Sequence, residues 1–267
     1  MNYSETRPAW SKLPVIDFNV VIPARYSSER LPGKPVALIA GKPMIQHVWQ
    51  RALDSGAAEV IIATDDDRIA DAAESFGATA CMTAPDHTSG TDRIAEVADL
   101  CDWTDDTVVV NVQGDEPLMP SAVIGECAAL LEDESVDIGT LASPLLSDGD
   151  FADENVVKVI RDGRSRAIYF SRAMIPFSRS GDTNALARET ALHHHGIYAY
   201  RCGVLRQIVA TEPSALERCE RLEQLRAMHL GLTIHVSVPS SRPGPGVDTP
   251  ADLRAVEQLL GGSASGG

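Results

Sequence analysis

The sequence has little of what marks nucleic-acid-binding and membrane proteins. Its 267 residues contain 23 Lys and Arg against 38 Asp and Glu, which excludes a broad basic surface for DNA, RNA or an anionic membrane. It has no run of about eighteen apolar residues, and its N-terminus lacks the apolar core of a secretory signal. We therefore expect a cytoplasmic protein that partners neither nucleic acid nor membrane.

The sequence also lacks the cysteine pattern of a disulfide-rich or zinc-binding protein. Its five cysteines are an odd number, they are widely spaced, and no C-x-x-C pair occurs. We expect all of them to be reduced thiols, as is usual in the cytosol. They are Cys81, Cys101, Cys127, Cys202 and Cys219.

The hydrophobic pattern predicts one α/β domain. With 44% hydrophobic residues the chain can bury one substantial core, which we place at residues 17–260. Strand and helix patterns alternate through the first half, as in βαβ units with a largely parallel sheet. The expected strands are 18–22, 59–63, 78–82 and 107–112, and the expected helices are 43–56, 66–76 and 92–100. The apolar run within 107–112 predicts that this strand is central.

The alternation loosens after about residue 143. Short strand-like pieces at 156–160, 167–170 and 197–200 surround a polar stretch at 178–189. We interpret about 143–205 as an antiparallel insert.

The last part of the chain is expected to return to the main sheet. The pattern predicts a helix over 216–230, a strand over 233–238 and a helix after Pro250. The two ends are expected to lie outside the domain, residues 1–16 as a loosely ordered extension and residues 261–267 as a flexible tail.

A cluster of cations follows the first strand. Between residues 20 and 35, Arg25, Arg30 and Lys34 face a single acid, Glu29, in a chain of formal charge -15. In doubly wound proteins, nucleotides and phosphates bind outside the carboxyl ends of the strands. These residues would otherwise be ordinary surface cations, but their place beside Gly33 at a strand end favours a polyanion site.

Two acids are candidate metal ligands. Asp115 directly follows the central strand, where a carboxylate can hold Mg²⁺ against a triphosphate. Because Mg²⁺ uses one or two carboxylates plus phosphate oxygens, Asp248 is a natural second ligand. Either acid could instead be a turn residue or a helix N-cap, and spacing cannot show whether two loops 133 residues apart meet.

Other motifs are ambiguous alone. Ser89 to Arg93 could cap a helix or bring Arg93 to a nucleotide. Three consecutive histidines, residues 193–195, point to alternate faces of a strand, so one histidine contacting an acidic substrate is favoured over a metal site. The pattern predicts a strand end at residues 169–172 and an amphipathic helix at residues 222–226.

Together these motifs resemble the CMP-Kdo synthetases, the 3-deoxy-manno-octulosonate (Kdo) cytidylyltransferases, over roughly residues 17–258. The resemblance is carried by Ile22-Pro23-Ala24-Arg25-Tyr26-Ser27, Arg30-Leu31-Pro32-Gly33-Lys34-Pro35, Gly41-Lys42-Pro43-Met44, Ala63-Thr64-Asp65, His87 to Arg93, Asn111 to Pro117, Tyr169 to Arg172, His194 with Gly196-Ile197-Tyr198, Leu222 to Arg226 and Gly246 to Pro250.

The resemblance implies a Rossmann-like nucleotidyltransferase fold with a mostly parallel sheet flanked by helices. It also implies a small antiparallel portion that helps form a homodimer. The implied reaction joins CTP and Kdo to CMP-Kdo and diphosphate with Mg²⁺ as cofactor, for lipopolysaccharide biosynthesis. The alternatives are a sibling enzyme for sialic acid or an 8-amino Kdo analogue, and a noncatalytic nucleotide-binding protein.

Site residues follow from the resemblance by motif position. The nucleotide positions are Ala24, Arg25, Lys34, Ser89, Arg93 and Gln113, and the metal positions are Asp115 and Asp248. The sugar-acid positions are Arg172, His194, Tyr198, Glu223 and Gln224, with His195 as the alternative to His194. In this scheme Lys34 and Arg25 stabilise the departing diphosphate, and Arg172 grips the Kdo carboxylate.

Overall fold

The computed structural model of the protein describes residues 16–28, 30–179 and 185–262. The expected N-terminal extension, apart from Ile16, lies outside these residues, as does 263–267 of the expected tail. Gly261 and Gly262 are the last residues of a helix rather than part of a tail.

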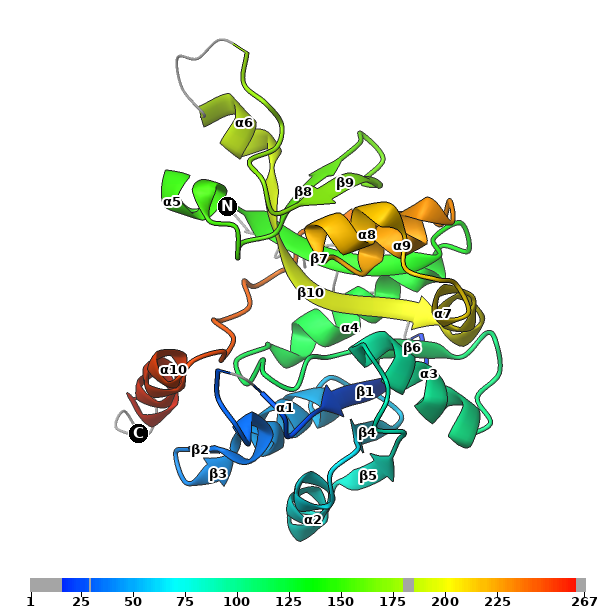
Figure 1. Ribbon diagram of the computed structural model, residues 1–267, viewed down its shortest axis with the longest axis vertical. Coiled ribbons are helices and arrows are strands. Elements are labelled where there is room, and N and C mark those ends of the chain that lie inside the picture. The colour runs from blue at the N-terminus through cyan, green and yellow to red at the C-terminus, as the bar shows by residue number, and fades with distance from the viewer. Residues whose placement is uncertain (1–15, 29, 180–184, 263–267) are drawn as a thin grey trace, which may run out of the picture.

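A mostly parallel sheet runs through the centre of the fold, with strand order β11-β7-β10-β6-β1-β4-β5 and a β8–β9 hairpin attached to β10 (Figure 1). β1 is parallel to β6 and β4, β4 is parallel to β5, and β11 is parallel to β7, whereas β10 is antiparallel to both its neighbours. The strands are β1 Phe18–Ala24, β4 Val60–Thr64, β5 Thr79–Met82, β6 Val108–Asn111, β7 Ile138–Pro144, β8 Lys158–Arg161, β9 Ala167–Ser171, β10 Leu192–Arg201 and β11 Ile234–Ser237, with a separate pair β2 Leu38–Ile39 and β3 Lys42–Pro43.

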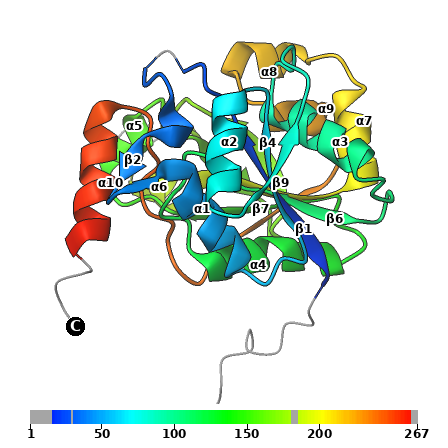
Figure 2. The ribbon, with the colours of Figure 1, turned by 90° about the horizontal axis from the view of Figure 1, so that it is seen from below.

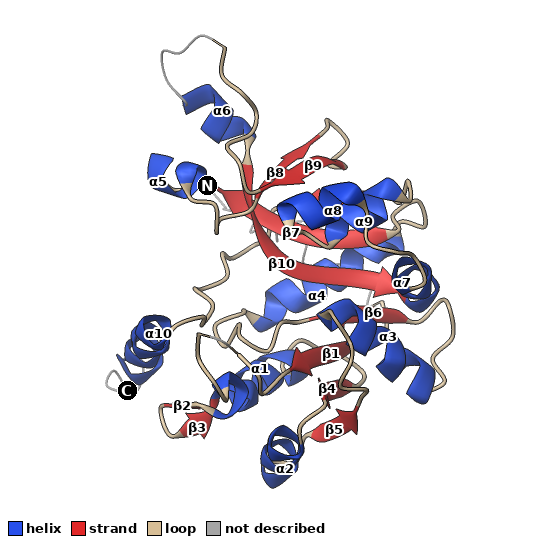
Figure 3. Cartoon of the chain, in the orientation of Figure 1, coloured by secondary structure: helices blue, strands red, loops and turns tan. Residues whose placement is uncertain are grey.

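Helices cover both faces of this sheet (Figure 3). α1, α2 and α4 contribute to one buried apolar cluster, and α3, α7 and α9 contribute to the other. The helices are α1 Met44–Leu53, α2 Asp67–Ser75, α3 Gly90–Leu100, α4 Ser121–Ala129, α5 Asp148–Ala152, α6 Ala185–Thr190, α7 Cys202–Val209, α8 Ala215–Glu220, α9 Gln224–His229 and α10 Pro250–Gly262, with 3-10 turns η2 Lys34–Val36 and η3 Leu130–Glu132.

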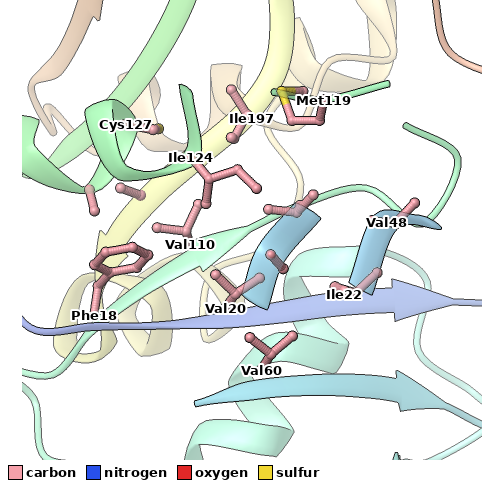
Figure 4. Packing of buried hydrophobic residues seen from close by; sticks show 14 of the residues in the cluster. Phe18, Val20, Ile22, Val48, Val60, Val110, Met119, Ile124, Cys127 and Ile197 are labelled. Carbon is pink, nitrogen blue, oxygen red and sulfur yellow. The ribbon is translucent and has the colours of Figure 1, made fainter. Parts of the chain in front are cut away.

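Alternation along β1 divides the core. Phe18, Val20 and Ile22 lie in the cluster beneath α1 and α4, while Val21 lies in the cluster on the opposite face. Figure 4 shows these β1 side chains packed with Val110 of β6. Successive side chains of a strand point to opposite faces, so one strand supplies both cores.

The expected α/β class and the first-half elements are confirmed, with ends that differ by one to a few residues. β6 lies in the middle of the strand order, as its apolar run predicts. The five cysteines are free, also as predicted. Within the described residues, no helix has the length and apolar content needed to cross a membrane.

The interpretation of 143–205 as a separate antiparallel insert is wrong for β10. Leu192 and His193 pair with β8, but Tyr198 to Arg201 pair with β6 inside the central sheet. A register shift between His194 and Tyr198, at Gly196 with φ +69°, lets one strand serve both regions. Within 143–205, the β8–β9 hairpin branches from β10 beside the main strand order, and α5 and α6 cover a small apolar core of their own.

Two expectations about the C-terminal helices are also wrong. The predicted helix 216–230 is two helices, because Arg221 adopts a left-handed conformation, φ +53°, that ends α8. The last helix does not return to the central sheet: Val256 of α10 packs with Ile39 and Met44, near β2. Figure 2 shows α10 at the side of the molecule beside β2.

Candidate active site

Two adjoining cavities open at the carboxyl edge of β1 and β6. The larger has a volume of about 930 Å³ and the smaller about 250 Å³, and Gly90 and Gln113 line both. The smaller is bordered by the basic loop after β1, including Arg25 and Lys34. The larger extends toward β10 and the start of α9, and its size suits a nucleotide-sized ligand.

The two predicted metal ligands meet at one cation. Lys34 Nζ lies 2.6 Å from Asp115 Oδ2 and 3.1 Å from Asp248 Oδ1. Arg30 also reaches Asp248 Oδ1, at 3.1 Å. Neither acid caps a helix, because Pro120 stands at the N-cap of α4 and Thr249 accepts the bond from Asp252 N at the start of α10. Both carboxylates are therefore directed at a single cation position.

Backbone packing brings these distant loops together. Val247 N donates to Asp115 O at 2.9 Å, so the loop before α10 lies along the loop after β6. A Cβ on Gly246 would lie 2.7 Å from Glu116 Oε1, and a Cβ on Gly114 would lie 2.9 Å from Pro23 O. Gly114 meets backbone, so its position requires glycine, whereas a side chain at residue 246 would force the Glu116 carboxyl or the loop to shift.

The charges around this position shift two pKa values. Burial tends to lower the pKa of Lys34, but Asp115 and Asp248 raise it above its ordinary value through charge and hydrogen bonds. Burial, then the charges of Asp115 and Asp248, raise the pKa of Glu116 to about 8. Near neutral pH, Lys34 is therefore charged and Glu116 is largely protonated.

The donor set suits Mg²⁺. Two carboxylates converge on a position that an ammonium now occupies, and carboxylate oxygens are the ligands Mg²⁺ uses. Among the described residues no group of three or more His, Cys, Asp or Glu forms a complete cage. The remaining ligands would have to be phosphate oxygens and water, as is usual for Mg²⁺ bound with a nucleotide.

The predicted nucleotide positions separate into two groups. Ala24, Arg25 and Gln113 line the smaller cavity, and Arg25 Nη2 donates to His87 O at 2.5 Å. Arg93 is fully buried and lines neither cavity; it donates to Thr83 Oγ1 and pairs with Asp65 at 3.1 Å. This conformation therefore offers no direct contact between Arg93 and a nucleotide.

Ser89 caps α3 and also reaches the sugar-side residues. It forms a capping box with Asp92, and its hydroxyl donates to Glu223 Oε1 at 3.0 Å. Burial raises the pKa of Glu223, although hydrogen bonds from Thr91 and Ser89 oppose the shift. Glu223 precedes α9, so the break between α8 and α9 places it and Gln224 in the wall of the larger cavity.

His194 has a defined tautomer. Thr140 Oγ1 donates its only proton to Ile197 O at 2.6 Å, so it accepts from His194 Nε2 at 2.9 Å. Nδ1 is then unprotonated and can accept a bond from a hydroxyl. Burial, then the neighbouring His195 and His193, lower the pKa of His194 to about 3, so this ring is neutral and a weak base. His194 and Tyr198 both line the larger cavity, with ring centroids 5.2 Å apart.

Arg172 also lines this cavity, but it is partly committed elsewhere. Its Nε donates to Glu220 O at 2.9 Å and its Nη1 to Glu154 O at 3.0 Å. Glu220 accepts from Ser171 Oγ at 2.6 Å and from Arg172 N at 3.0 Å, which fixes the end of β9.

Sequence reasoning missed several cavity residues. Glu116 was quoted only as part of a motif, although it lies beside the acid pair. Nothing in the sequence around Arg221 or Arg242 indicated a binding site, because only folding brings their segments to the wall of the larger cavity. His195 accepts or donates a bond to Ser143 Oγ at 2.7 Å, and His193 lies beside Arg242. The missed residues Glu116, Arg221 and Arg242 all line the larger cavity. His193 and His195 line it too, and these two belong to the predicted histidine run, in which His195 was the alternative to His194.

The chain is similar to known cytidylyltransferases. A family model described as cytidylyltransferase matches residues 19–234. The chain is 51% identical to the 3-deoxy-manno-octulosonate cytidylyltransferase of Halorhodospira halophila (strain DSM 244 / SL1) over 91% of this chain and 96% of the relative. It is 49% identical to the same-named protein of Vibrio vulnificus (strain CMCP6), over 92% of this chain and 98% of the relative.

Two solved structures are also similar to this chain. One is titled as CMP:2-keto-3-deoxy-manno-octonic acid synthetase complexed with CTP, with TM-score 0.84, 42% identity, and coverage of 93% of this chain and 100% of that one. A cytidylyltransferase from Leptospira borgpetersenii serovar Hardjo-bovis (strain JB197) has TM-score 0.60 at 15% identity, over 92% of this chain and 87% of that one. This second likeness shows the fold alone.

Proposed function

The chain belongs to the 3-deoxy-manno-octulosonate cytidylyltransferases, and we propose that it works with Mg²⁺ held between Asp115 and Asp248. It is an enzyme that activates Kdo with CTP, giving CMP-Kdo and diphosphate. The relatives are named for Kdo, which favours this sugar over sialic acid or the 8-amino analogue. The observation that carries the proposal is the convergence of both carboxylates on Lys34 at the edge of the smaller cavity.

The chemistry requires positioning rather than a side-chain nucleophile. The anomeric hydroxyl of Kdo attacks the α-phosphorus of CTP in line, and diphosphate leaves. Arg25 and Lys34 line the smaller cavity, where their charges stabilise the departing diphosphate. When bound, Mg²⁺ would lower the pKa of the attacking hydroxyl and neutralise charge on the α-phosphate.

The larger cavity holds the sugar acid in this proposal. His194 offers an unprotonated Nδ1 to a sugar hydroxyl, and Glu223 and Gln224 offer further polar groups from the start of α9. Arg172 is proposed to meet the carboxylate with the donors that Glu220 and Glu154 do not use.

The direct test measures diphosphate release from CTP and Mg²⁺. Kdo is run beside 8-amino Kdo, N-acetylneuraminate, a control without acceptor, and UTP in place of CTP. Release that needs both Kdo and CTP is expected, whereas release only with another sugar acid would contradict the substrate assignment.

Substitution tests the metal site. Asp115→Asn and Asp248→Asn are each expected to reduce kcat by about 10²-fold or more while the protein stays folded, because an amide lacks the anionic oxygen that Mg²⁺ needs. Both variants should also require more Mg²⁺ for half-maximal rate. A variant with normal kcat and normal Mg²⁺ dependence would remove that residue from the site.

We also infer that the enzyme is a homodimer joined through the region around α6. Phe177 and Leu186 are 88% and 74% exposed, and large apolar side chains exposed near one another in the chain are typical of interaction sites. Figure 1 shows α6 at the end of the molecule beyond β8 and β9.

Sedimentation of a charged variant tests the dimer. Phe177→Glu is expected to shift the protein to monomer, because a carboxylate would be buried without a partner. Leu100→Glu, at the exposed end of α3 and 58% exposed in the wild type, is the matched control and should remain a dimer. A monomeric wild type would reject the inference.

The cell compartment and pathway are inferred from chemistry. Free thiols and a CTP substrate are consistent with the cytoplasm, and Kdo is a lipopolysaccharide sugar, so the product would enter lipopolysaccharide biosynthesis. Cell fractionation with an antibody against the chain would test the location.

A further inference from the structure

Arg242 occupies a defined place in the wall of the larger cavity. It lies in the loop between β11 and α10, which runs past the ends of β7 and β10 in Figure 1. Its Nη1 donates to Pro144 O at 2.8 Å, and its Nη2 lies 3.3 Å from His193 Nδ1. A guanidinium has no acceptor, so His193 Nδ1 accepts this bond and the ring carries its proton on Nε2.

The electrostatics agree with that arrangement. Burial, then the charge of Arg242, lower the pKa of His193, so the ring is neutral and able to accept. His195 continues the polar wall, with its ring 5.0 Å from that of His193 and its Nε2 2.7 Å from Ser143 Oγ. Arg242 is therefore an exposed cation, held by two hydrogen bonds, beside neutral imidazoles.

This wall lies away from the predicted metal acids. Pro144 ends β7, and β10 separates β7 from β6, whose following loop carries Asp115. Neighbouring strands are about 4.8 Å apart, so two spacings place the wall about 10 Å across the sheet from β6. The wall also lies further along the strands, because Thr140 is level with Asn111 at the end of β6 and Pro144 follows four residues later, about 13 Å on. The cavity thus has a metal end and a distal end, with Arg242 at the distal end.

The chemistry of the substrate decides what reaches each end. In a 2-keto sugar acid the carboxylate is bonded to the anomeric carbon, and the hydroxyl on that carbon attacks CTP. Both groups must then lie near the metal end. The hydroxyl-bearing tail of an eight-carbon acid extends away from them, toward the distal end.

We propose that Arg242, held by Pro144 and His193, binds hydroxyl groups at the tail of the sugar acid and disfavours a tail that ends in an ammonium. This assignment rests on the proposed function of the site. Arg242 is a binding residue here, and His193 is a positioning residue that acts through it. The guanidinium donates to hydroxyl oxygens and repels a positive group at the same place.

One acid near this wall has the opposite charge. Asp150 of α5 also lines the cavity, and an exposed carboxylate there would attract an ammonium. Its oxygens are already engaged, because Oδ2 accepts from Leu146 N at 3.1 Å and Oδ1 from Ser147 Oγ at 3.0 Å. We therefore expect Arg242, rather than Asp150, to decide whether the distal end favours a neutral tail over one that carries an ammonium. An Asp150 variant belongs in the test.

The experiment compares Kdo with its 8-amino analogue, whose tail carries an ammonium at neutral pH. Initial rates of diphosphate release give kcat and KM for each acceptor at saturating CTP and Mg²⁺, and KM for CTP separately. The variants are Arg242→Ala, Arg242→Gln and Asp150→Asn. Arg164→Ala is the control, since Arg164 is an exposed arginine in the β8–β9 turn, outside the cavity lining.

Arg242→Ala is expected to raise KM for Kdo by about ten-fold or more, the loss that follows removal of a charge-assisted hydrogen bond. KM for CTP should stay at its wild-type value, and the preference for Kdo over the 8-amino analogue should fall by about ten-fold. Arg242→Gln keeps donors without the charge, so it should recover part of the Kdo affinity but not the preference. Arg164→Ala and Asp150→Asn should keep the wild-type preference.

Other outcomes would overturn the assignment. An unchanged KM for Kdo in folded Arg242→Ala would remove Arg242 from the sugar site. An equal loss of kcat with both acceptors, at unchanged KM, would show that Arg242 only holds the loop that carries Asp248. A changed preference in Asp150→Asn alone would assign the discrimination to that acid. Wild-type enzyme inactive with Kdo would instead reject the proposed function itself.

Discussion

Gly246→Ala gives the sharpest test of how the two metal acids are brought together. The added Cβ would lie 2.7 Å from Glu116 Oε1, whereas ordinary contact begins at 3.4 Å, so the atoms must separate by about 0.7 Å. Glu116 is half-buried, and moving its carboxyl would disturb the wall of the larger cavity that it lines. We expect the loop to move instead, and Asp248 lies only two residues further on.

The size of the effect follows from that displacement. A misplacement of about 1 Å at a reacting centre can cost about 10²-fold in rate, so a loss of about 10- to 100-fold in kcat is expected. Overpacking a folded segment costs about 1–3 kcal/mol, so stability should fall as well, but the protein should remain folded. The assay is diphosphate release at saturating CTP and Kdo, with unfolding followed in denaturant.

Two controls separate this cause from others. Gly163→Ala places a Cβ where nothing lies within 4 Å, so it should keep wild-type activity and stability. In a Glu116→Ala background the close contact is gone, so adding Gly246→Ala should cause little further loss of kcat. The reasoning is refuted if Gly246→Ala keeps full activity, or if its loss is undiminished in the Glu116→Ala background.

Two further predictions concern stability. Arg226 forms a two-point pair with Glu217, with Nε–Oε2 2.9 Å and Nη2–Oε1 2.6 Å. Arg226→Ala should therefore lower the free energy of unfolding, measured by denaturant titration, by about 3–5 kcal/mol. Arg218 is exposed, so Arg218→Ala should change this free energy little, and an equal loss in both variants would contradict the role of burial. Burial, and then the neighbouring histidines, lower the folded-state pKa of His194 to about 3, so below the unfolded value of about 6.5 the unfolded chain binds more protons. The free energy of unfolding should therefore fall with decreasing pH by about 1.4 kcal/mol per pH unit for this histidine, and His194→Gln, which keeps a donor toward Thr140, should reduce that slope. A slope identical in both proteins between about pH 6 and 4 would show that His194 is not buried neutral in solution.

Local signals were sufficient wherever structure depends on near neighbours in sequence. The alternating pattern predicted the βαβ elements of the first half, and the run Val108 to Val110 predicted a central strand. The Pro/Gly-punctuated loop after β1 predicted cations at a strand end, where Arg25 and Lys34 do line a cavity. Each of these features follows from side-chain periodicity or turn chemistry.

Features that depend on contacts between distant parts of the chain could not be predicted from local patterns. β10 was interpreted as part of an insert, because nothing local shows that one strand changes partners at Gly196. The helix 216–230 was predicted unbroken, because Arg221 is not a residue that usually adopts a left-handed conformation. Arg93 was placed at the nucleotide by motif, whereas burial against Asp65 and Thr83 is decided by how α3 packs.

The sequence by itself determined the α/β class, the basic loop and the residue types available for phosphate and Mg²⁺ chemistry. Tertiary structure alone decided that Asp115 and Asp248 face the same Lys34 and that Arg242 lies beside His193. The physical reason is that these contacts depend on backbone hydrogen bonds and close glycine packing between loops far apart in the chain. Residue spacing carries no record of such contacts, because it reports only which face of one element a side chain occupies.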